Sequence, residues 1–221
     1  MKKTTFCIAM LPLVGLTALL STEASAEQSF SANVAVTSNY LWRGIEQTNG
    51  KSAISGGIDY SADSGFYVGA WVSNADWAPG MTYELDLYAG YAGQINDAVS
   101  FDVGYLYYAY PDEDSDDADF SEIYGNISFN NLTLGLAVLA DAEAADFGDS
   151  IYATADYEFA LASEATIALH LGSYSGDWLA EDSIDYGVSL SKDGFTLGIS
   201  NTDLDDDDVK FYISYSIDIA L

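Results

Sequence analysis

Apolar and polar residues alternate along most of the chain, and the C-terminal stretch VKFYISYSIDIAL shows the pattern most clearly. One face of an extended chain carries Val209, Phe211, Ile213, Tyr215, Ile217, Ile219 and Leu221. Successive side chains of a β-strand point to opposite faces, so this pattern predicts a strand. A typical strand has ~5–6 residues, whereas a strand that crosses a bilayer has ~9–11. The length of the stretch therefore favours a transmembrane strand.

The same alternation recurs about twelve times, and no segment keeps a helical period. The predicted strands are residues 29–44, 52–61, 66–74, 83–91, 99–108, 120–129, 132–140, 150–160, 165–173, 183–191, 195–201 and 208–221. Long connections alternate with tight ones such as ADSG at 62–65 and Asn130-Asn131. This alternation is typical of outer-membrane barrels, which have long extracellular loops and short periplasmic turns.

The predicted apolar faces carry aromatic residues mainly near the strand ends and aliphatic residues in the middle. The aromatic positions are Tyr40, Trp42, Tyr60, Phe66, Tyr83, Tyr91, Tyr107, Phe129, Phe159, Phe195 and Phe211. Two aromatic girdles around an aliphatic belt are typical of a membrane-spanning barrel. A soluble barrel or sandwich is the alternative, but the chain is too short to bury twelve apolar faces. We therefore predict an all-β fold, a transmembrane antiparallel up-and-down β-barrel of about twelve strands, of the outer-membrane type.

The last strand has to close the barrel against the first, because an unpaired strand edge is not tolerated in lipid. Its alternating apolar end resembles the C-terminal signal by which outer-membrane barrels are recognised for assembly. The residues assigned to this signal are Phe211, Ile213, Tyr215, Ile217, Ile219 and Leu221. Such chains usually finish on Phe, and here Leu221 takes that place. The expected partners are the barrel-assembly machinery and the lipid of the outer membrane.

The N-terminal residues predict the compartment. Lys2 and Lys3 precede an apolar run from Phe6 to Leu20, and the small residues Ala24-Ser25-Ala26 follow it. This order is typical of a secretory signal peptide, here residues 1–26, which leaves residues 27–221 as the barrel domain. An uncleaved anchor is the alternative, but the run is shorter than the ~20 residues of a spanning helix. The prediction places the mature protein in the bacterial outer membrane.

Composition narrows the possible partners. The chain has six basic and 35 acidic side chains and a net charge of −29. Nucleic acids and anionic lipid surfaces both require basic patches, so neither is expected as a main partner. The one cysteine, Cys7, lies inside the predicted signal peptide, so the mature chain can form neither a disulfide bond nor a thiolate metal site.

The polar faces of the strands should line the lumen. They carry nine carboxylates and few cations: Asp59, Glu84, Asp86, Asp102, Glu122, Asp156, Glu158, Asp185 and Asp218 against Arg43, Lys210 and the single histidine, His170. Because acidic rings favour the entry of cations, we predict a narrow passive channel that prefers cations or small neutral and cationic solutes. Arg43 and Lys210 are expected to pair with facing carboxylates near the extracellular ends of the first and last strands.

Two kinds of inward residue give opposite indications of whether the lumen is open. Inward glycines favour open space: Gly57, Gly69, Gly90, Gly104, Gly135, Gly172, Gly187 and Gly198. Inward aromatic residues could narrow or close it: Tyr67, Trp71, Tyr88, Tyr108, Tyr124, Tyr152 and Tyr212. A barrel of ~8 strands is filled by side chains and one of ~16–18 holds an aqueous channel, so twelve lies between. The alternative function is therefore a structural or surface-interaction barrel with a plugged lumen and no transport.

Enzymatic chemistry and bound metals find little support in the sequence. His170 and Ser173 could suggest an outer-membrane phospholipase, but the two side chains are predicted on opposite faces, out of hydrogen-bond reach. Asp112, Asp114 and Asp116 resemble the start of a calcium loop, yet the glycine and the bidentate glutamate of such a loop are missing. We predict no enzyme, no cofactor and no specific metal site. Diffuse binding of divalent cations to the acidic loops is left open.

Several segments resemble a known family. The stretch SNYLWRGIEQTNGKSAISGGIDY and the later segments GFYVGAWVSN, YELDLYAGY and YAYPDEDSDDADFSEIYG look like those of the TorF-type porins, small bacterial outer-membrane proteins. The resemblance covers nearly the whole mature chain, and its most specific part is Tyr40, Trp42, Arg43 and Gly44. Glu46 departs from the small hydroxyl residue expected before Gln47. The resemblance implies a barrel and a pore, without a known substrate.

Overall fold

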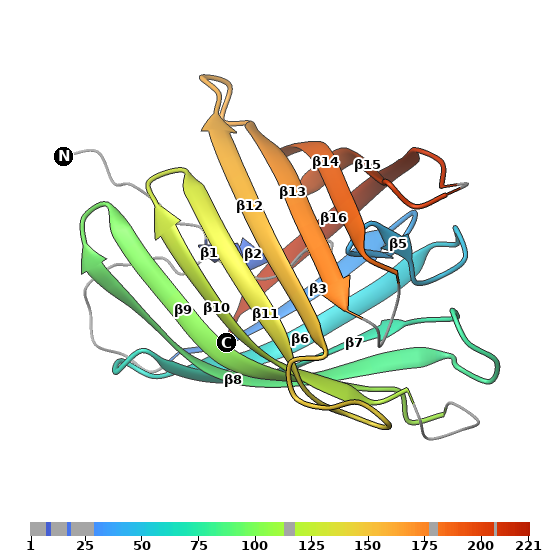
Figure 1. Ribbon diagram of the computed structural model, residues 1–221. Coiled ribbons are helices and arrows are strands. Elements are labelled where there is room, and N and C mark those ends of the chain that lie inside the picture. The colour runs from blue at the N-terminus through green and yellow to red at the C-terminus, as the bar shows by residue number, and fades with distance from the viewer. Residues whose placement is uncertain (1–7, 10–16, 19–28, 113–117, 177–180, 206) are drawn as a thin grey trace.

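A computed structural model describes residues 8–9, 17–18, 29–112, 118–176, 181–205 and 207–221. Twelve antiparallel strands form a closed barrel in the order β10-β11-β12-β13-β14-β15-β16-β3-β6-β7-β8-β9 (Figure 1). The strands are β3 (Ser29–Thr37), β6 (Ala53–Ser61), β7 (Phe66–Asn74), β8 (Tyr83–Asn96), β9 (Val99–Ala109), β10 (Phe120–Phe129), β11 (Leu132–Ala142), β12 (Ser150–Ala160), β13 (Thr166–Gly176), β14 (Ser183–Lys192), β15 (Phe195–Thr202) and β16 (Lys210–Ala220). The predicted fold class and strand number are confirmed.

Two small sheets lie outside this order. β1 (Ile8–Ala9) pairs with β2 (Thr17–Ala18), and β4 (Leu41–Trp42) pairs with β5 (Ile45–Glu46). Most of the predicted signal peptide lies outside the described residues. In the part of the chain that the structure describes, no helix is long and apolar enough to cross a membrane.

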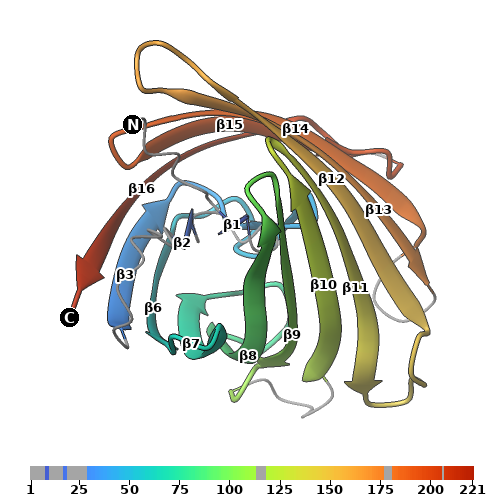
Figure 2. The ribbon, with the colours of Figure 1, turned by 90° about the vertical axis from the view of Figure 1, so that its left-hand side faces the viewer.

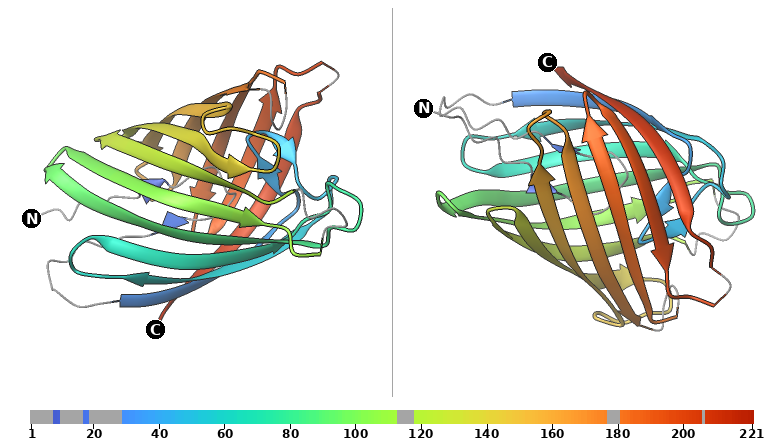
Figure 3. Two further views of the ribbon diagram at one scale, coloured as in Figure 1. Left: turned by 60° about the horizontal axis from the view of Figure 1, so that its bottom comes forward. Right: turned by 90° about the horizontal axis from the view of Figure 1, so that it is seen from above.

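The barrel closes between its last and first strands. β16 pairs with β3 from Ser214↔Thr37 to Ala220↔Ser31, and the two strands lie side by side in Figures 2 and 3. β15 pairs only with the first part of β16, from Ser200↔Lys210 to Phe195↔Tyr215. The last residues of β16 therefore extend beyond β15 and have β3 as their strand partner. The C-terminal residues thus complete the hydrogen bonding of the first strand.

The outer face is apolar and exposed. The even-odd pattern of each strand is visible in the burial of its residues; in β16, for example, Phe211, Ile213, Tyr215, Ile217 and Ile219 are all exposed. Exposed and partly exposed aromatic rings contact one another at the end of the barrel that carries the tight turns. These pairs are Phe30–Tyr60, Phe66–Tyr91, Tyr91–Phe101, Tyr157–Phe159 and Phe195–Tyr215. They form an aromatic girdle of the kind found at a membrane interface.

One predicted strand was too long. We expected an extended segment from residue 29 to residue 44, with Tyr40 and Trp42 facing lipid, but β3 ends at Thr37 and the chain then turns into the barrel. Tyr40 is buried and Trp42 packs against the buried interior, so both girdle assignments are wrong. Alternation alone does not specify which face meets lipid and which meets protein.

Candidate functional site: the lumen

The interior of the barrel has two differently filled halves. We call the part near the connections 38–52, 75–82, 110–119, 143–149, 177–182 and 203–209 the long-loop half, and the part near the tight turns the short-turn half. The long-loop half contains a continuous cluster of buried residues that includes Tyr40, Trp71, Tyr108, Phe120 and Tyr152. In the short-turn half many inward residues are only half-buried, among them Asn33, Asp59, Glu158 and Ser189. The two halves therefore differ in how far solvent reaches.

A hairpin built from β4 and β5 folds into the long-loop half. Trp42 pairs with Ile45, and the two residues between them, Arg43 and Gly44, have φ angles of 51° and 77°. Two successive positive φ angles identify the tight turn that suits a two-residue β-hairpin. Gly44 fits this turn without strain, whereas an arginine in the left-handed region is uncommon. A Cβ on Gly44 would lie 2.6 Å from Cγ2 of Thr202, so the tip also needs glycine for its close approach to β15.

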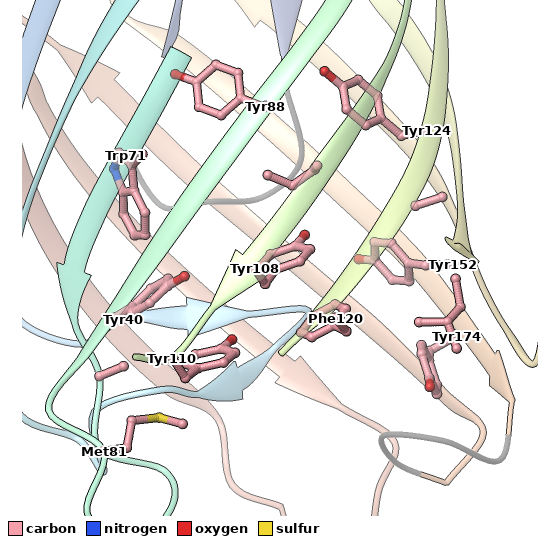
Figure 4. Close-up of a cluster of buried hydrophobic side chains, with 14 of the residues drawn as sticks. Tyr40, Trp71, Met81, Tyr88, Tyr108, Tyr110, Phe120, Tyr124, Tyr152 and Tyr174 are labelled. Atoms are coloured by element: carbon pink, nitrogen blue, oxygen red, sulfur yellow. The ribbon is translucent and has the colours of Figure 1, made fainter. Parts of the chain in front are cut away.

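Aromatic rings of the barrel wall hold the hairpin. Figure 4 shows Tyr40 on the hairpin among the labelled tyrosines of the cluster. The Tyr40 ring meets the Trp71 ring edge-on at 5.6 Å, and its hydroxyl donates to Oε1 of Glu84 at 2.9 Å. Trp42 meets Tyr108 and Phe120 edge-on, and these two rings stack on each other at 4.2 Å. The hairpin is thus packed as tightly as a core element.

Arg43 forms the central ion pair of the lumen. Its Nη2 donates to both carboxylate oxygens of Glu122 on β10, at 2.7 and 2.6 Å, and the two side chains are 3% and 2% exposed. The guanidinium lies between the rings of Trp42 and Tyr152, 4.1 and 4.2 Å from their centroids. Its Nε and Nη1 are buried and have no hydrogen-bond partner among the described residues. A buried pair of this kind leaves a costly bare charge if either partner is removed.

Inward glycines do not leave open space. In the register, Tyr67 faces Gly90, Gly90 faces Gly104, and Gly104 faces Tyr124. A Cβ on Gly90 or Gly104 would lie 2.3 or 2.5 Å from a tyrosine hydroxyl, and the hydroxyls of Tyr67 and Tyr124 meet above the two glycines. Tyr88 covers Gly69 and Tyr212 covers Gly198 in the same way. The expectation that these glycines favour an open lumen is therefore wrong at these positions, because each supports a tyrosine ring.

His170 lies inside the barrel in a polar network. Its Nδ1 is 2.6 Å from Oδ1 of Asp156, and its Nε2 is 2.8 Å from Oδ1 of Asp185. The hydroxyl of Tyr152 donates to Asp185, at 2.9 Å to Oδ2, and the Tyr152 ring is the one that stacks on Arg43. Ser173 is exposed on the outer face, away from the histidine. The network therefore links the histidine to the hairpin through Tyr152.

A cavity of about 180 Å³ lies between the hairpin and the wall formed by β12–β16. Leu41, Arg43 and Gly44 line it from the hairpin side. The wall contributes Asp156, Ala168, His170, Asp185, Gly187, Val188, Ser189, Ile199, Ser200 and Tyr212. Since a water molecule occupies ~30 Å³ in the liquid, the cavity has room for a few waters or one small solute.

The other predicted lumen residues fall into three groups. Glu84, Asp86 and Asp102 are buried against the tyrosines of the packed wall, where Tyr40 and Tyr110 donate to Glu84 and Tyr67 donates to Asp102. Asp59 and Glu158 are half-buried in the short-turn half, where Tyr88 donates to Asp59. Asp218 is exposed near the C-terminal end of β16. The nine carboxylates therefore do not form one uniform ring.

Lys210 and Arg43, the two cations predicted for the lumen, each form an ion pair, and the two pairs lie on different strands. Lys210 forms an ion pair with Asp207, in the connection that leads into β16. Arg43 reaches β10 instead, because it lies on the hairpin rather than at the end of the first strand. The expectation that Arg43 ends the first strand is wrong. Each cation nevertheless pairs with a carboxylate.

Carboxylates of the long connections are held by local donors. Hydrogen bonds from Lys51 and Asn49 lower the pKa of Asp76 below its usual range, and the hydroxyl of Thr82 does the same for the pKa of Asp112. These groups stay ionised at neutral pH. Asp114 and Asp116 of the calcium-loop hypothesis lie outside the described residues. Among the residues that the structure describes, no group of three or more His, Cys, Asp or Glu is arranged to hold a metal ion.

Sequence reasoning missed the hairpin and the residues that receive it. Tyr174, Phe120 and Tyr110 belong to the buried cluster, yet nothing in a period of two separates a ring that packs on a neighbour from one that lines open space. One signal was available: Arg-Gly after Leu-Trp can form a two-residue turn between short strands. That turn places Leu41 and Trp42 in a separate hairpin, after β3 has ended at Thr37.

Comparisons with known proteins agree with the fold. The model of a bacterial protein family of unknown function, Gcw_chp, matches residues 21–219. No curated protein matches the chain by sequence. Among solved structures, the KdgM porin is similar with a TM-score of 0.55 and 12% identity, covering 87% of this chain and 99% of the other. A KdgM porin in complex with disordered oligogalacturonate gives the same values. A membrane protein from a study of in-meso crystallization has a TM-score of 0.54 and 11% identity, covering 86% of this chain and 83% of that chain.

Proposed function

The chain belongs to the bacterial family Gcw_chp, whose function is unknown. Because the family gives no function, we propose one from the residues of the lumen: the protein is a narrow passive porin of the outer membrane. We propose further that it prefers cations or small neutral and cationic solutes. The similarity to outer-membrane porin structures supports the channel class. We also propose that the chain is related to the TorF-type porins. Cleavage after residue 26 and recognition of the C-terminal signal by the assembly machinery are part of the same proposal.

The charge of the short-turn half carries the proposal. Asp59, Asp156 and Glu158 are inward and partly exposed, so solvent reaches their carboxylates. Arg43 is neutralised by Glu122 and Lys210 by Asp207, so neither offsets these carboxylates. A low-dielectric barrel wall strengthens the field of such groups on ions in the lumen. Cations should therefore enter more readily than anions.

The same field predicts which solutes are refused. Oligogalacturonate, the sugar acid in the KdgM porin complex, carries one carboxylate per residue. The carboxylates of the present lumen would repel it, so we propose that this chain does not share that solute. The charge of the lumen should instead favour cations and small neutral molecules.

A plugged, structural barrel is the second candidate, and the buried cluster around the β4–β5 hairpin favours it. Recording purified protein in a planar bilayer under a KCl gradient separates the two. A reversal potential close to the potassium equilibrium potential supports the cation-preferring porin. Anion preference would contradict the assignment of the lumen charges, and the absence of any conductance would favour the plugged barrel.

A further inference from the structure

The cavity beside the hairpin lies between the hairpin tip and the inner wall of β12–β16. On one side of the hairpin, Tyr40, Trp42 and the wall of β7–β10 are packed together with Tyr108 and Phe120. On the other side, the hairpin residues Leu41, Arg43 and Gly44 line the cavity together with the inner wall of β12–β16. A solute that crosses beside the docked hairpin would therefore find space along β12–β16.

This inference rests on the proposed function and refines it. We propose that the hairpin tip and the Asp156–His170–Asp185 cluster form the selectivity constriction of the pore, where one small cation at a time contacts the Asp156 carboxylate. The solute class is an alkali or ammonium-type cation. The hairpin limits the size of the solute that can pass, and the carboxylates select solutes of positive charge.

The charges around the cavity support a cation. An imidazolium of His170 between two carboxylates leaves one net negative charge, and a neutral imidazole leaves two. Arg43, the nearest opposing charge, is already bound by both oxygens of Glu122. The field in the cavity is thus negative in either protonation state of the histidine.

Within the cluster, Asp156 is the group open to a passing ion. Its side chain is 28% exposed, whereas that of Asp185 is 3% exposed and accepts hydrogen bonds from Tyr152 as well as from His170. Gly172 leaves room for this arrangement, because a Cβ there would lie 2.2 Å from Oδ2 of Asp185. Asp185 therefore positions the histidine, and Asp156 meets the ion.

Arg43 is the positioning residue for the constriction. It holds the hairpin tip to β10 through Glu122 and to β12 through the ring of Tyr152. Gly44 in the same turn lies close to Thr202 and Asp185, since a Cβ there would be 2.6 and 3.0 Å from their side chains, so the tip is held near the cavity from both sides. Loss of the Arg43 contacts should free the hairpin and widen the passage without changing the carboxylates of β12–β16.

Single-channel recording tests both roles with four variants of the full chain. The first replaces residues 40–48 by a short Gly-Ser linker, and the second is Arg43→Gln. The third is Asp156→Asn, and the fourth, Asp218→Asn, is its control because Asp218 is exposed near the end of β16, outside the cavity. Potassium, methylammonium and tetraethylammonium chloride serve as probes. Heat-modifiable migration on a gel shows which variants fold.

We expect the linker variant to conduct severalfold more than the natural chain and to pass tetraethylammonium, with Arg43→Gln changed in the same direction. Asp156→Asn should lower the potassium-to-chloride permeability ratio severalfold, and Asp218→Asn should not. If the natural chain conducts and the hairpin variants behave like it, or if the two aspartate variants are equal, the inference is wrong while the porin function stands. If no folded variant conducts, the proposed function fails with it. If the linker variant does not fold, Arg43→Gln decides alone.

Discussion

The long-loop half and the short-turn half of the barrel have the same outer face but different interiors. Outside, both present exposed aliphatic and aromatic residues. Inside, the long-loop half holds a hairpin, stacked rings and a buried ion pair, whereas the short-turn half holds half-buried carboxylates and small polar side chains. The outer face contacts lipid along its whole height, so one apolar pattern is sufficient for the whole barrel. The inner face contacts the packed hairpin in one half and solvent in the other, so its residues differ between the halves.

The difference also shows how the interior of a twelve-stranded barrel is filled. A barrel of ~8 strands is just filled by the side chains of its wall, and twelve strands enclose more space than that. In the long-loop half the chain fills the space with the β4–β5 hairpin, which packs against the rings of Tyr108, Phe120 and Tyr152. In the short-turn half, half-buried carboxylates and small polar residues face the lumen beside Tyr67 and Tyr88. The proposed constriction at the hairpin rests on this difference.

Removal of Phe211–Leu221 should have the largest effect, because it affects both halves at once. The truncation takes away the partner of β3 along its whole paired length and most of the partner of β15. Open strand edges do not persist in a bilayer, so the truncated chain should fail to enter the outer membrane and should be degraded or aggregate in the periplasm. Fractionation and heat-modifiable migration measure this. Normal migration of the truncated chain in outer-membrane fractions would refute the closure by β16.

Breaking the buried ion pair should destabilise the long-loop half. Glu122→Gln leaves the Arg43 charge buried and unpaired, so we expect the free energy of unfolding in lipid or detergent to fall by about 3–5 kcal/mol. The control is Lys51→Gln, which breaks the exposed pair between Lys51 and Asp76 and should change the unfolding free energy very little. Urea titrations followed by tryptophan fluorescence give both values. Similar losses for the two variants would mean that the lumen is not closed to water at Glu122.

Arginine substitutions on β11 compare the outer face with the inner one. Leu134 is exposed on the outside in the middle of the apolar band, and Leu134→Arg should cost about 2–4 kcal/mol of barrel stability. Its neighbour Thr133 points inward in the short-turn half, so Thr133→Arg should be much milder. Unfolding titrations in lipid vesicles provide the comparison. Equal costs at the two positions would show that inside and outside have been exchanged.

Glycine substitutions test whether the tyrosine rings pack directly on the inward glycines. Gly104→Ala would place a methyl group 2.5 Å from the hydroxyl of Tyr124 and 2.9 Å from the backbone oxygen of Ala89, so we expect a loss of about 1–3 kcal/mol. Gly125→Ala is the control, because its nearest contact would be an ordinary 3.6 Å to Val103. Thermal unfolding in detergent resolves the two. A neutral Gly104→Ala would mean that Tyr124 moves freely in the lumen.

The sequence was sufficient for the barrel but not for its contents. The strands from 66–74 to 208–221 were predicted to within three residues, except that β8 runs on to Asn96. They were predicted well because one face of each must meet lipid, and a shift of one residue would reverse every side chain. Tyr40 and Trp42 carried the same alternation and were misplaced. Their apolar partners, Trp71, Tyr108 and Phe120, come from distant strands, and no local pattern reports such contacts.

The inward residues show the same limit at the site. His170 and its carboxylates could be placed on the inner face by counting, but their convergence depends on the register that sets Asp156 opposite His170. The role of the glycines was misjudged for a related reason. Gly104 next to an empty lumen and Gly104 beneath Tyr124 look alike in one strand, and only the pairing of β9 with β10 distinguishes them.

Labelling of single cysteines with a charged, membrane-impermeant thiol reagent tests most directly that water fills one half of the lumen and the hairpin closes the other. The chain's one cysteine, Cys7, lies in the predicted signal peptide, so the purified mature protein should give little background. Glu158→Cys reports on the short-turn half, Leu139→Cys on the buried cluster and Leu134→Cys on the outer face. We predict fast labelling of Glu158→Cys in folded protein and slow labelling of the other two until the protein is unfolded. Equal labelling of Glu158→Cys and Leu139→Cys would contradict the account.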